Sequence, residues 1–166
     1  MKKVFSFTDI RRAETSGDIT LTVTLVMDRF EEQFSRAQYE LDSMVMADMV
    51  PFMPMITSSF INATIARSAA IAGSGLVYAA APPYGRFLYK GKVMVSPTTG
   101  STWAKYGEKK VLVSEYQGKT KAKEEMEYTK TFHPKVTKEW FEKAKRMNKS
   151  KWINHTKARA GGGNNA

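Results

Sequence analysis

The chain has 166 residues, which suits one compact domain with appendages better than two domains. Hydrophobic residues make up 42% and Cys is absent, which excludes general disorder, disulfide frameworks, thiol catalysis and Cys-based metal sites. The 26 Lys and Arg exceed the 16 Asp and Glu by 10, and residues 105–159 hold 16 of the basic and 7 of the acidic residues. Such a basic segment favours a polyanion, an anionic membrane or an acidic protein partner, although solubility alone is an equal explanation.

The N-terminal part predicts a strand followed by a long helix. Met1–Asp9 has the charges of a secretory segment, but its apolar run is too short, so we expect no signal peptide. Residues 19–27 alternate apolar side chains with Thr, which predicts a strand. From about 29 to 49, apolar residues recur at three- and four-residue spacing, which predicts a helix with one apolar face. Asp28 followed by Glu31 resembles a capping box at its start.

Half of the ten Met residues fall between positions 44 and 55, around the two prolines that end this helix. Met44 and Met49 lie on the apolar stripe and are expected in the core. Met46, Met53 and Met55 lie off the stripe, and Met is an adaptable contact residue, so we expect these three to be able to face a partner.

The middle of the chain predicts short elements. A helix or turn carries Phe60, and residues 63–72 are ambiguous between helix and strand. A Gly-Ser-Gly turn leads into 76–79, which is expected to be a buried strand. The Pro pair at 82–83 opens a short helix that stops at Gly91, because Pro is tolerated in a first turn and Gly ends helices.

The last third combines loops with a closing helix. Residues 93–95 and 111–113 are strand-like, and the segments 96–110 and 117–125 are long loops rich in Gly, Thr and Lys, which are either disordered or serve outside the fold. Apolar alternation at 126–132 predicts a late strand. A final helix capped by Thr137 presents an aromatic stripe and a basic back; the stripe consists of Trp140, Phe141, Ala144, Met147 and Trp152.

These elements define an α+β fold class. We expect a small antiparallel sheet packed by a long helix, with a C-terminal closing helix and extended loops near 96–125. Residues 1–159 form one domain, and 160–166 form a flexible tail rich in Gly and Asn. The longest weakly charged stretch, Met49–Ala66, is interrupted by prolines and polar residues, so we expect a soluble protein without a membrane partner.

Catalytic chemistry is not visible in the sequence. His133 and His155 are separated by a helix and lack acidic neighbours at ligand spacing, so a metal site is not expected. Gly73-Ser74-Gly75 is too short for a phosphate loop, and no nucleophile elbow is present. We therefore expect a protein that is not an enzyme and has no cofactor and no metal.

A binding role fits better, because one loop interleaves aromatic and basic side chains. Trp103, Lys105, Tyr106, Lys109 and Lys110 form a mixture that could stack on bases and contact phosphates. The same residue types dominate contacts between protein subunits. No regular series of stacking residues follows, so a subunit contact is the favoured interpretation.

Three segments together resemble a bacteriophage minor capsid family, whose members are tail-completion or head-tail joining proteins of long-tailed phages. Pro82–Lys92 (PPYGRFLYKGK) resembles the family's PYARYLYYGK signature. Phe132–Lys145 (FHPKVTKEWFEKAK) looks like its closing HP.A...WFE.AK element. Val50–Pro54 followed by Thr57 is similar to its yvP.dTG.L..S stretch, from which Ile56, Ser58 and Phe60 depart. The resemblance covers roughly residues 28–151.

The resemblance implies a non-enzymatic virion protein, made in the host cytoplasm and placed at the head-tail junction, or neck. It implies a homo-oligomeric ring, commonly of six copies, between the head-closure protein and the tail terminator or tail tube, with genome DNA passing through the pore. A tail terminator or a head-closure protein is a neighbouring possibility. In a different class, the basic segment leaves open a sequence-independent nucleic-acid-binding protein.

Two sets of residues are therefore candidates for contacts. The candidate subunit or partner contacts are Tyr84, Arg86, Tyr89, Lys92, Trp103 and Tyr106. The candidate basic residues facing DNA or an acidic partner are Lys105, Lys109, Lys110, Lys119, Lys121 and Lys123.

Overall fold

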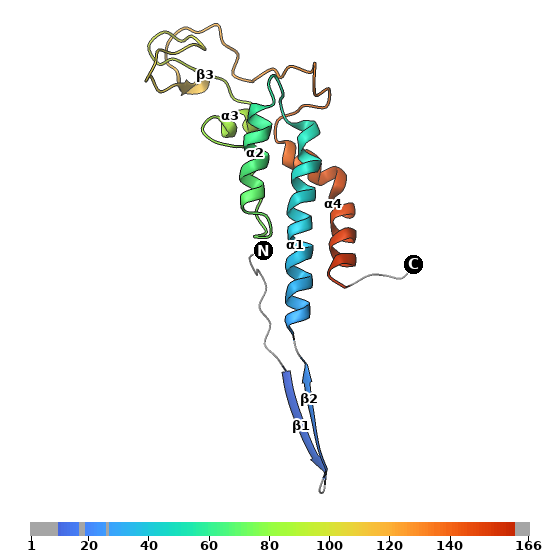
Figure 1. Cartoon of the computed structure of the whole chain (residues 1–166). Helices are drawn as coiled ribbons and strands as arrows, with labels where there is room; N and C mark the ends of the chain where they lie inside the picture. The colour runs from blue at the N-terminus through green and yellow to red at the C-terminus, as the bar shows by residue number, and fades with distance from the viewer. Residues whose placement is uncertain (1–9, 17–18, 26, 162–166) are drawn as a thin grey trace.

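A computed structural model describes residues 10–16, 19–25 and 27–161 of the chain. In Figure 1 helices form the body, a β-hairpin extends from one end, and long loops gather at the other. The α+β class, with its long helix, closing C-terminal helix and extended loops, is confirmed. The predictions for Met1–Asp9 and for residues 162–166 lie outside the described residues.

The hairpin consists of two antiparallel strands, β1 (Ile10–Ser16) and β2 (Ile19–Leu25). Their register runs from Ile10 opposite Leu25 to Ser16 opposite Ile19. The strand expected from the Thr alternation is thus present as β2, whereas β1 has no comparable pattern. Two strands alone are marginally stable in water. Because this hairpin lies away from the helices (Figure 1), we expect contact with another protein surface to stabilise it.

The long helix is α1 (Asp28–Met49), and a 3-10 turn, η1 (Val50–Phe52), follows it with Pro51 inside. The capping box expected at Asp28 is wrong, because Met27 occupies the N-cap position and Asp28 already belongs to the first turn. Its charge there still favours the helix N-terminus. The next helix, α2 (Ser59–Ala70), resolves most of the ambiguous stretch as helix.

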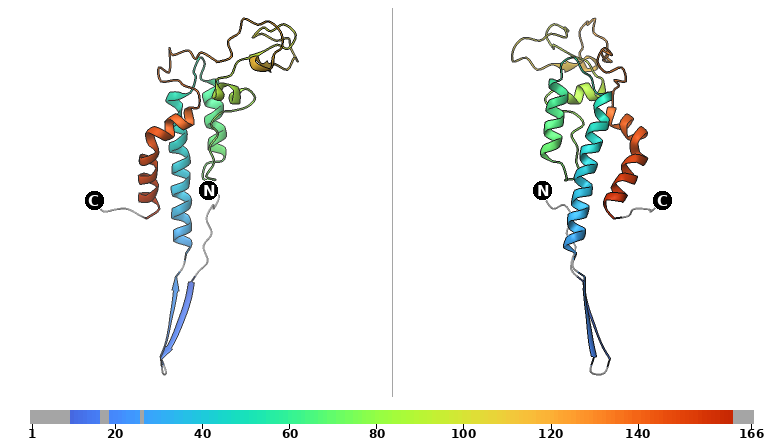
Figure 2. Two further views of the ribbon diagram at one scale, coloured as in Figure 1. Left: turned by 180° about the vertical axis from the view of Figure 1, so that it is seen from behind. Right: turned by 45° about the vertical axis from the view of Figure 1, so that its right-hand side comes forward.

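Helix α1 lies between α2 and the closing helix α4 (Trp140–Arg159), which runs antiparallel to it (Figures 1 and 2). The expectation that Met46 and Met53 face a partner is wrong, because both are buried. Because both α2 and α4 pack against α1, residues outside a single apolar stripe of α1 are also buried, and Met53 reaches the same core after η1. The buried core comprises Val45, Met46, Met49, Phe52, Met53, Phe60, Ile61, Ala81, Trp140, Ala144 and Trp152.

Residues 76–79 are not the buried strand that their apolar composition predicts. Leu76 is 66% exposed, and the backbone of Tyr78 bonds to a side chain instead of to a strand. The Ser68 hydroxyl accepts from the Tyr78 N–H at 3.0 Å and donates to the Tyr78 carbonyl at 3.2 Å. The short helix α3 (Gly85–Lys90) follows and ends at Gly91 in the left-handed conformation, as expected.

The loop end holds a second small sheet, in which β3 (Met94–Val95) pairs antiparallel with β4 (Val111–Leu112), and a 3-10 turn, η2 (Val113–Glu115), follows. The late strand expected at 126–132 is wrong. Its residues bond singly to the segment 88–92, as when the Met126 N–H donates to the Gly91 carbonyl at 2.8 Å. These single hydrogen bonds hold the segment against 88–92 without forming a continuous strand pairing.

Helix α4 begins at Trp140, so Thr137 is not its cap. The Thr137 N–H donates to the Phe52 carbonyl at 3.1 Å, and the Glu139 N–H donates to the Tyr89 carbonyl at 2.8 Å. The residues before α4 therefore bond to other segments, and Glu139 has a positive φ of 52°. Within the described residues, no helix is both long and apolar enough to cross a membrane.

Candidate functional site

The segments 50–57, 82–92 and 132–145 meet at one junction, where α3 and the start of α4 lie together. The His133 Nδ1 lies 2.8 Å from the Met53 carbonyl, which links the segment 132–145 to the segment 50–57. The Lys90 Nζ lies 3.0 Å from the Glu139 Oε1, which links the segment 82–92 to the segment 132–145. Segments far apart in the sequence thus build one packed unit.

Trp140 is the centre of this junction. It is 0% exposed, and its indole N–H donates to the Ala79 carbonyl at 2.6 Å. The Tyr89 ring meets it edge to face, with 4.9 Å between centroids, and the Phe60 ring lies 6.0 Å away. Burial raises the pKa of Tyr89, and the charges of Glu142 and Glu139 add to that shift. Tyr89 therefore has a contact inside the monomer, and a subunit contact by Tyr89 stays a prediction.

The other contact candidates of this region lie nearer the surface. Tyr84 and Arg86 are exposed, and the Arg86 guanidinium lies 4.5 Å from the centroid of the neighbouring Phe87 ring. Lys92 is half-buried and forms an isolated bridge with Glu125. These three residues belong to α3 or flank it, whereas Trp103 and Tyr106 belong to the long loop 96–110.

That loop is ordered around Glu108. The Oε1 of Glu108 accepts from the Ser96 hydroxyl at 2.7 Å and the Thr98 hydroxyl at 2.8 Å, and the Oε2 accepts from the Lys105 N–H at 3.0 Å. Trp103, which is 85% exposed, and the fully exposed Tyr106 lie on the same loop. A loop fixed by its own carboxylate thus presents two aromatic rings to the outside.

The loop is expected to lose these bonds in acid. The hydroxyl of Ser96, together with that of Thr98, holds the pKa of the Glu108 carboxyl below its ordinary value of 4.5. The folded state favours the charged carboxylate, so the stabilisation is complete above about pH 4.5 and is lost as the pH falls through the lowered pKa. The Lys105 amide resonance in an NMR titration should report this step below pH 4.5, and Glu108→Gln should abolish it. A step at or above that value would contradict the expectation.

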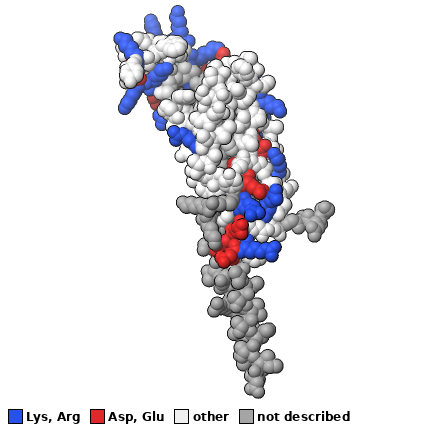
Figure 3. Space-filling model, viewed as in Figure 1, with Lys and Arg blue, Asp and Glu red and all other residues white. Residues whose placement is uncertain are grey.

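The six basic candidates are exposed on the loop end, where Figure 3 shows Lys side chains projecting from the molecule. Two of them have partners: the Lys110 ammonium donates to the Thr102 carbonyl and the Lys123 ammonium pairs with Glu127. For the other four, no ion pair is found within the described part of the chain. They are Lys105, Lys109, Lys119 and Lys121.

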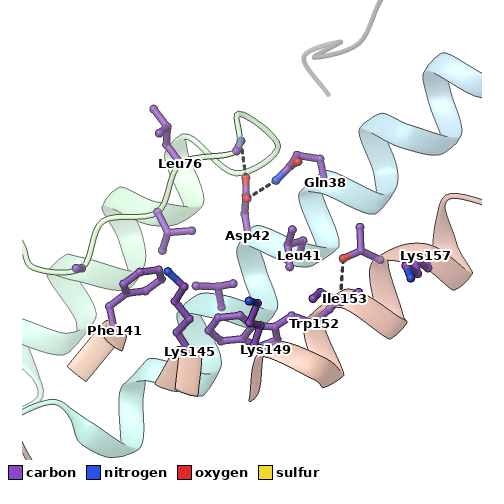
Figure 4. Close-up of a pocket in the computed structure, with 15 residues that line it drawn as sticks. Gln38, Leu41, Asp42, Leu76, Phe141, Lys145, Lys149, Trp152, Ile153 and Lys157 are labelled. Carbon is purple, nitrogen blue, oxygen red and sulfur yellow. Dashed lines mark hydrogen bonds between the residues drawn. The ribbon is translucent and has the colours of Figure 1, made fainter. Parts of the chain in front are cut away.

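A groove that the sequence did not reveal lies between α1, α4 and the segment 75–79 (Figure 4). Its volume is about 570 Å³. Three lysines of α4 line it at i, i+4 and i+12, namely Lys145, Lys149 and Lys157. This helical spacing was visible in the sequence, but the apolar lining from α1 and 75–79 was not. The apolar lining includes Leu41, Val45, Val77, Phe141, Trp152 and Ile153.

Asp42 fixes the wall of this groove. It is 4% exposed, and its Oδ2 accepts from the Gly73 N–H at 2.7 Å and the Gly75 N–H at 3.1 Å. The Gln38 amide donates to Oδ1 at 2.7 Å. Gly73 and Gly75 have positive φ values of 90° and 78°, a conformation that Gly adopts without strain. The carboxylate thus holds the Gly-Ser-Gly turn against α1.

Removing this carboxylate should destabilise the protein. Asp42→Ala leaves the buried Gly73 N–H and the part-buried Gly75 N–H without an acceptor. We expect the free energy of unfolding to fall by about 3 kcal/mol, with a smaller loss for Asp42→Asn. Urea denaturation measures the change. Glu32→Ala is the control, because the exposed Glu32–Arg36 pair contributes less than about 0.5 kcal/mol. Equal losses in the two Ala variants would show that Asp42 does not hold the turn.

A second set of α4 side chains pairs with acidic residues of α1. The Lys151 Nζ lies 3.1 Å from an Asp48 carboxylate oxygen, and the Trp152 indole donates to the other at 2.7 Å. The Glu40 Oε2 lies 2.9 Å from the His155 Nε2 and 2.8 Å from the Arg159 Nε. Acidic α1 and basic α4 are therefore complementary along their shared face.

Both histidines bond to groups that do not form a metal site. His133 meets a backbone carbonyl and His155 meets Glu40. Within the described ranges, no three His, Asp or Glu side chains come together in a way that could hold a metal ion.

Comparison with known proteins gives no relative: no family model, no curated protein and no solved structure matches the chain.

Proposed function

We propose that the chain is a structural component of the neck of a long-tailed bacteriophage, where copies form a ring that joins the head-closure protein to the tail. The observation that carries the proposal is the junction around Trp140. The three segments that resemble the phage family lie at sequence positions 50–57, 82–92 and 132–145, yet they bond to one another in space. Three motifs that build one unit in space are more informative than three separate motifs.

The shape of the subunit also suits assembly. The hairpin and the loop end extend in opposite directions from the helices (Figure 1), and the aromatic rings of Trp103 and Tyr106 are exposed. Exposed aromatic side chains and short two-stranded sheets are stabilised when a neighbour covers them. A ring supplies such a neighbour to every subunit.

The test is to image particles purified from cells that produce the virus carrying this gene, using an antibody against the chain. Label at the head-tail junction supports the proposal. Absence of the chain from particles, or label confined to the capsid shell or the tail tip, overturns it. Label directly against the capsid vertex or against the tail tube would favour the head-closure or tail-terminator alternative.

The nucleic-acid alternative is tested with the purified chain and duplex DNA. A sequence-independent binder should bind tightly at low salt and lose affinity steeply as salt rises, because it releases counterions. A neck component should bind free DNA poorly. Tight binding by a chain that is absent from particles would replace the neck proposal with this alternative.

A further inference from the structure

Helix α4 carries two rows of cations with different surroundings. One row faces α1 and is paired there, as Lys151 with Asp48 and Arg159 with Glu40. The other row, Lys145, Lys149 and Lys157, lines the groove. No ion pair to this second row is found in the described part of the chain. The helix therefore keeps three lysines without an ion pair along the edge of the groove, and the Lys145 Nζ lies 5.7 Å from the centroid of the Phe141 ring.

The groove itself is apolar and partly open. Leu76 and Ile153 line it and remain 66% and 41% exposed, and the buried ring of Trp152 also contributes to the lining. Figure 4 shows Leu76 and the α4 side chains on opposite sides of Asp42 and Leu41. Exposed apolar side chains beside unpaired charges of one sign are typical of a surface that a partner covers.

We propose that this groove binds an acidic amphipathic helix of a partner protein. The apolar face of such a helix would cover the lining, and its carboxylates would pair with the three lysines. Lys145 and Lys157 are twelve residues apart, which corresponds to about 18 Å along a helix, or a little over three turns of a ligand helix. The inference concerns partner chemistry and does not depend on the neck proposal.

Two other occupants fit less well. Nucleic acid would use the lysines but would leave the apolar lining uncovered. A second copy would have to offer an acidic helix, and α1 is the acidic helix of this chain. Its Glu40 and Asp48 already pair with α4, and its Glu32 pairs with Arg36. Its Asp42 bonds to the turn at Gly73. Most carboxylates of α1 are thus engaged within the chain, so a separate acidic helix suits the groove better.

The probe is a synthetic amphipathic helix of about 18 residues, with Leu on one face and Glu along both flanks, and its counterpart has Lys in place of every Glu. Binding of each fluorescently labelled peptide to the full chain is measured by anisotropy in about 0.15 M salt. The Glu peptide should bind at least about tenfold more tightly than the Lys peptide, because three exposed ion pairs together are worth about one decade in affinity.

A charge reversal provides the decisive variant. Lys145→Glu, Lys149→Glu and Lys157→Glu together should reverse the preference, so that the Lys peptide binds more tightly. The control combines Lys130→Glu, Lys135→Glu and Lys143→Glu, which changes the net charge equally at exposed positions outside the groove and should keep the preference for Glu. Thermal melting verifies that both variants remain folded.

Three outcomes would overturn the proposal. The first is equal affinity of the two peptides for the unaltered chain. The second is an unchanged preference in the groove variant. The third is self-association that Ile153→Ser abolishes while neither peptide binds, which would make a second copy the occupant.

Discussion

Trp140→Ala should lower the free energy of unfolding by about 4 kcal/mol, the usual cost of removing a buried Trp ring from a core. The side chain is 0% exposed and contacts the rings of Tyr89 and Phe60. Its indole N–H also bonds to the Ala79 carbonyl, so the substitution removes a hydrogen bond together with the packing. Because the three junction segments meet here, the loss should appear as one cooperative change in urea denaturation.

Trp103→Ala is the matched control, since Trp103 is 85% exposed and makes no buried packing. We expect it to change stability by less than about 0.5 kcal/mol. Trp140→Phe separates the two contributions, because it keeps a ring but loses the N–H donor, and it should cost about 1 to 2 kcal/mol. Similar unfolding curves for Trp140→Ala and Trp103→Ala would refute the central role of Trp140.

The second large effect concerns assembly instead of folding. The double variant Trp103→Ala/Tyr106→Ala should leave the unfolding curve unchanged, because both rings are exposed on the loop that Glu108 orders. It should nevertheless prevent head-tail joining, since aromatic contacts at the centre of an interface each contribute about 2 kcal/mol, or about thirtyfold in affinity. This prediction rests on the proposed neck function.

The measurement is complementation of a phage that lacks the gene, with infectious particles counted and unjoined heads and tails examined by electron microscopy. Trp103→Phe/Tyr106→Phe is the control, because it preserves both rings, and we expect it to restore joining. A normal yield of infectious particles from the Ala variant would show that the loop has no assembly role. Failure of both variants would point to a need for the indole N–H or the phenol.

The sequence predicted local elements well where side-chain spacing was unambiguous. The apolar stripe of α1, the Thr alternation of β2 and the stop of α3 at Gly91 all correspond to observed elements. It failed at 76–79 and 126–132, because the backbone there bonds to single groups of other segments instead of to a neighbouring strand. The Tyr78 N–H donates to the Ser68 hydroxyl, and the Met126 N–H donates to the Gly91 carbonyl. Neither an apolar run nor a period-two pattern specifies the partner of the backbone.

Of the candidate subunit contacts, some have the position that the sequence indicated and one has a partner that the sequence did not reveal. Trp103 and Tyr106 lie exposed on the loop end that their composition indicated. Tyr89, from the same signature, packs on Trp140, a contact that joins residues 51 positions apart in the sequence. The spacing of residues along the chain does not predict a contact between two side chains so far apart in the sequence.

The sequence by itself therefore determined the α+β class and the long basic loops, because propensity, turn residues and charge act locally. The tertiary structure decided which of the excess basic side chains form ion pairs within the chain and which do not. Lys151 and Lys149 are two residues apart on α4, yet one pairs with Asp48 and the other borders an apolar groove. Residues two apart on a helix face different directions, so only the position of α1 decides which lysine is neutralised and which remains for a partner.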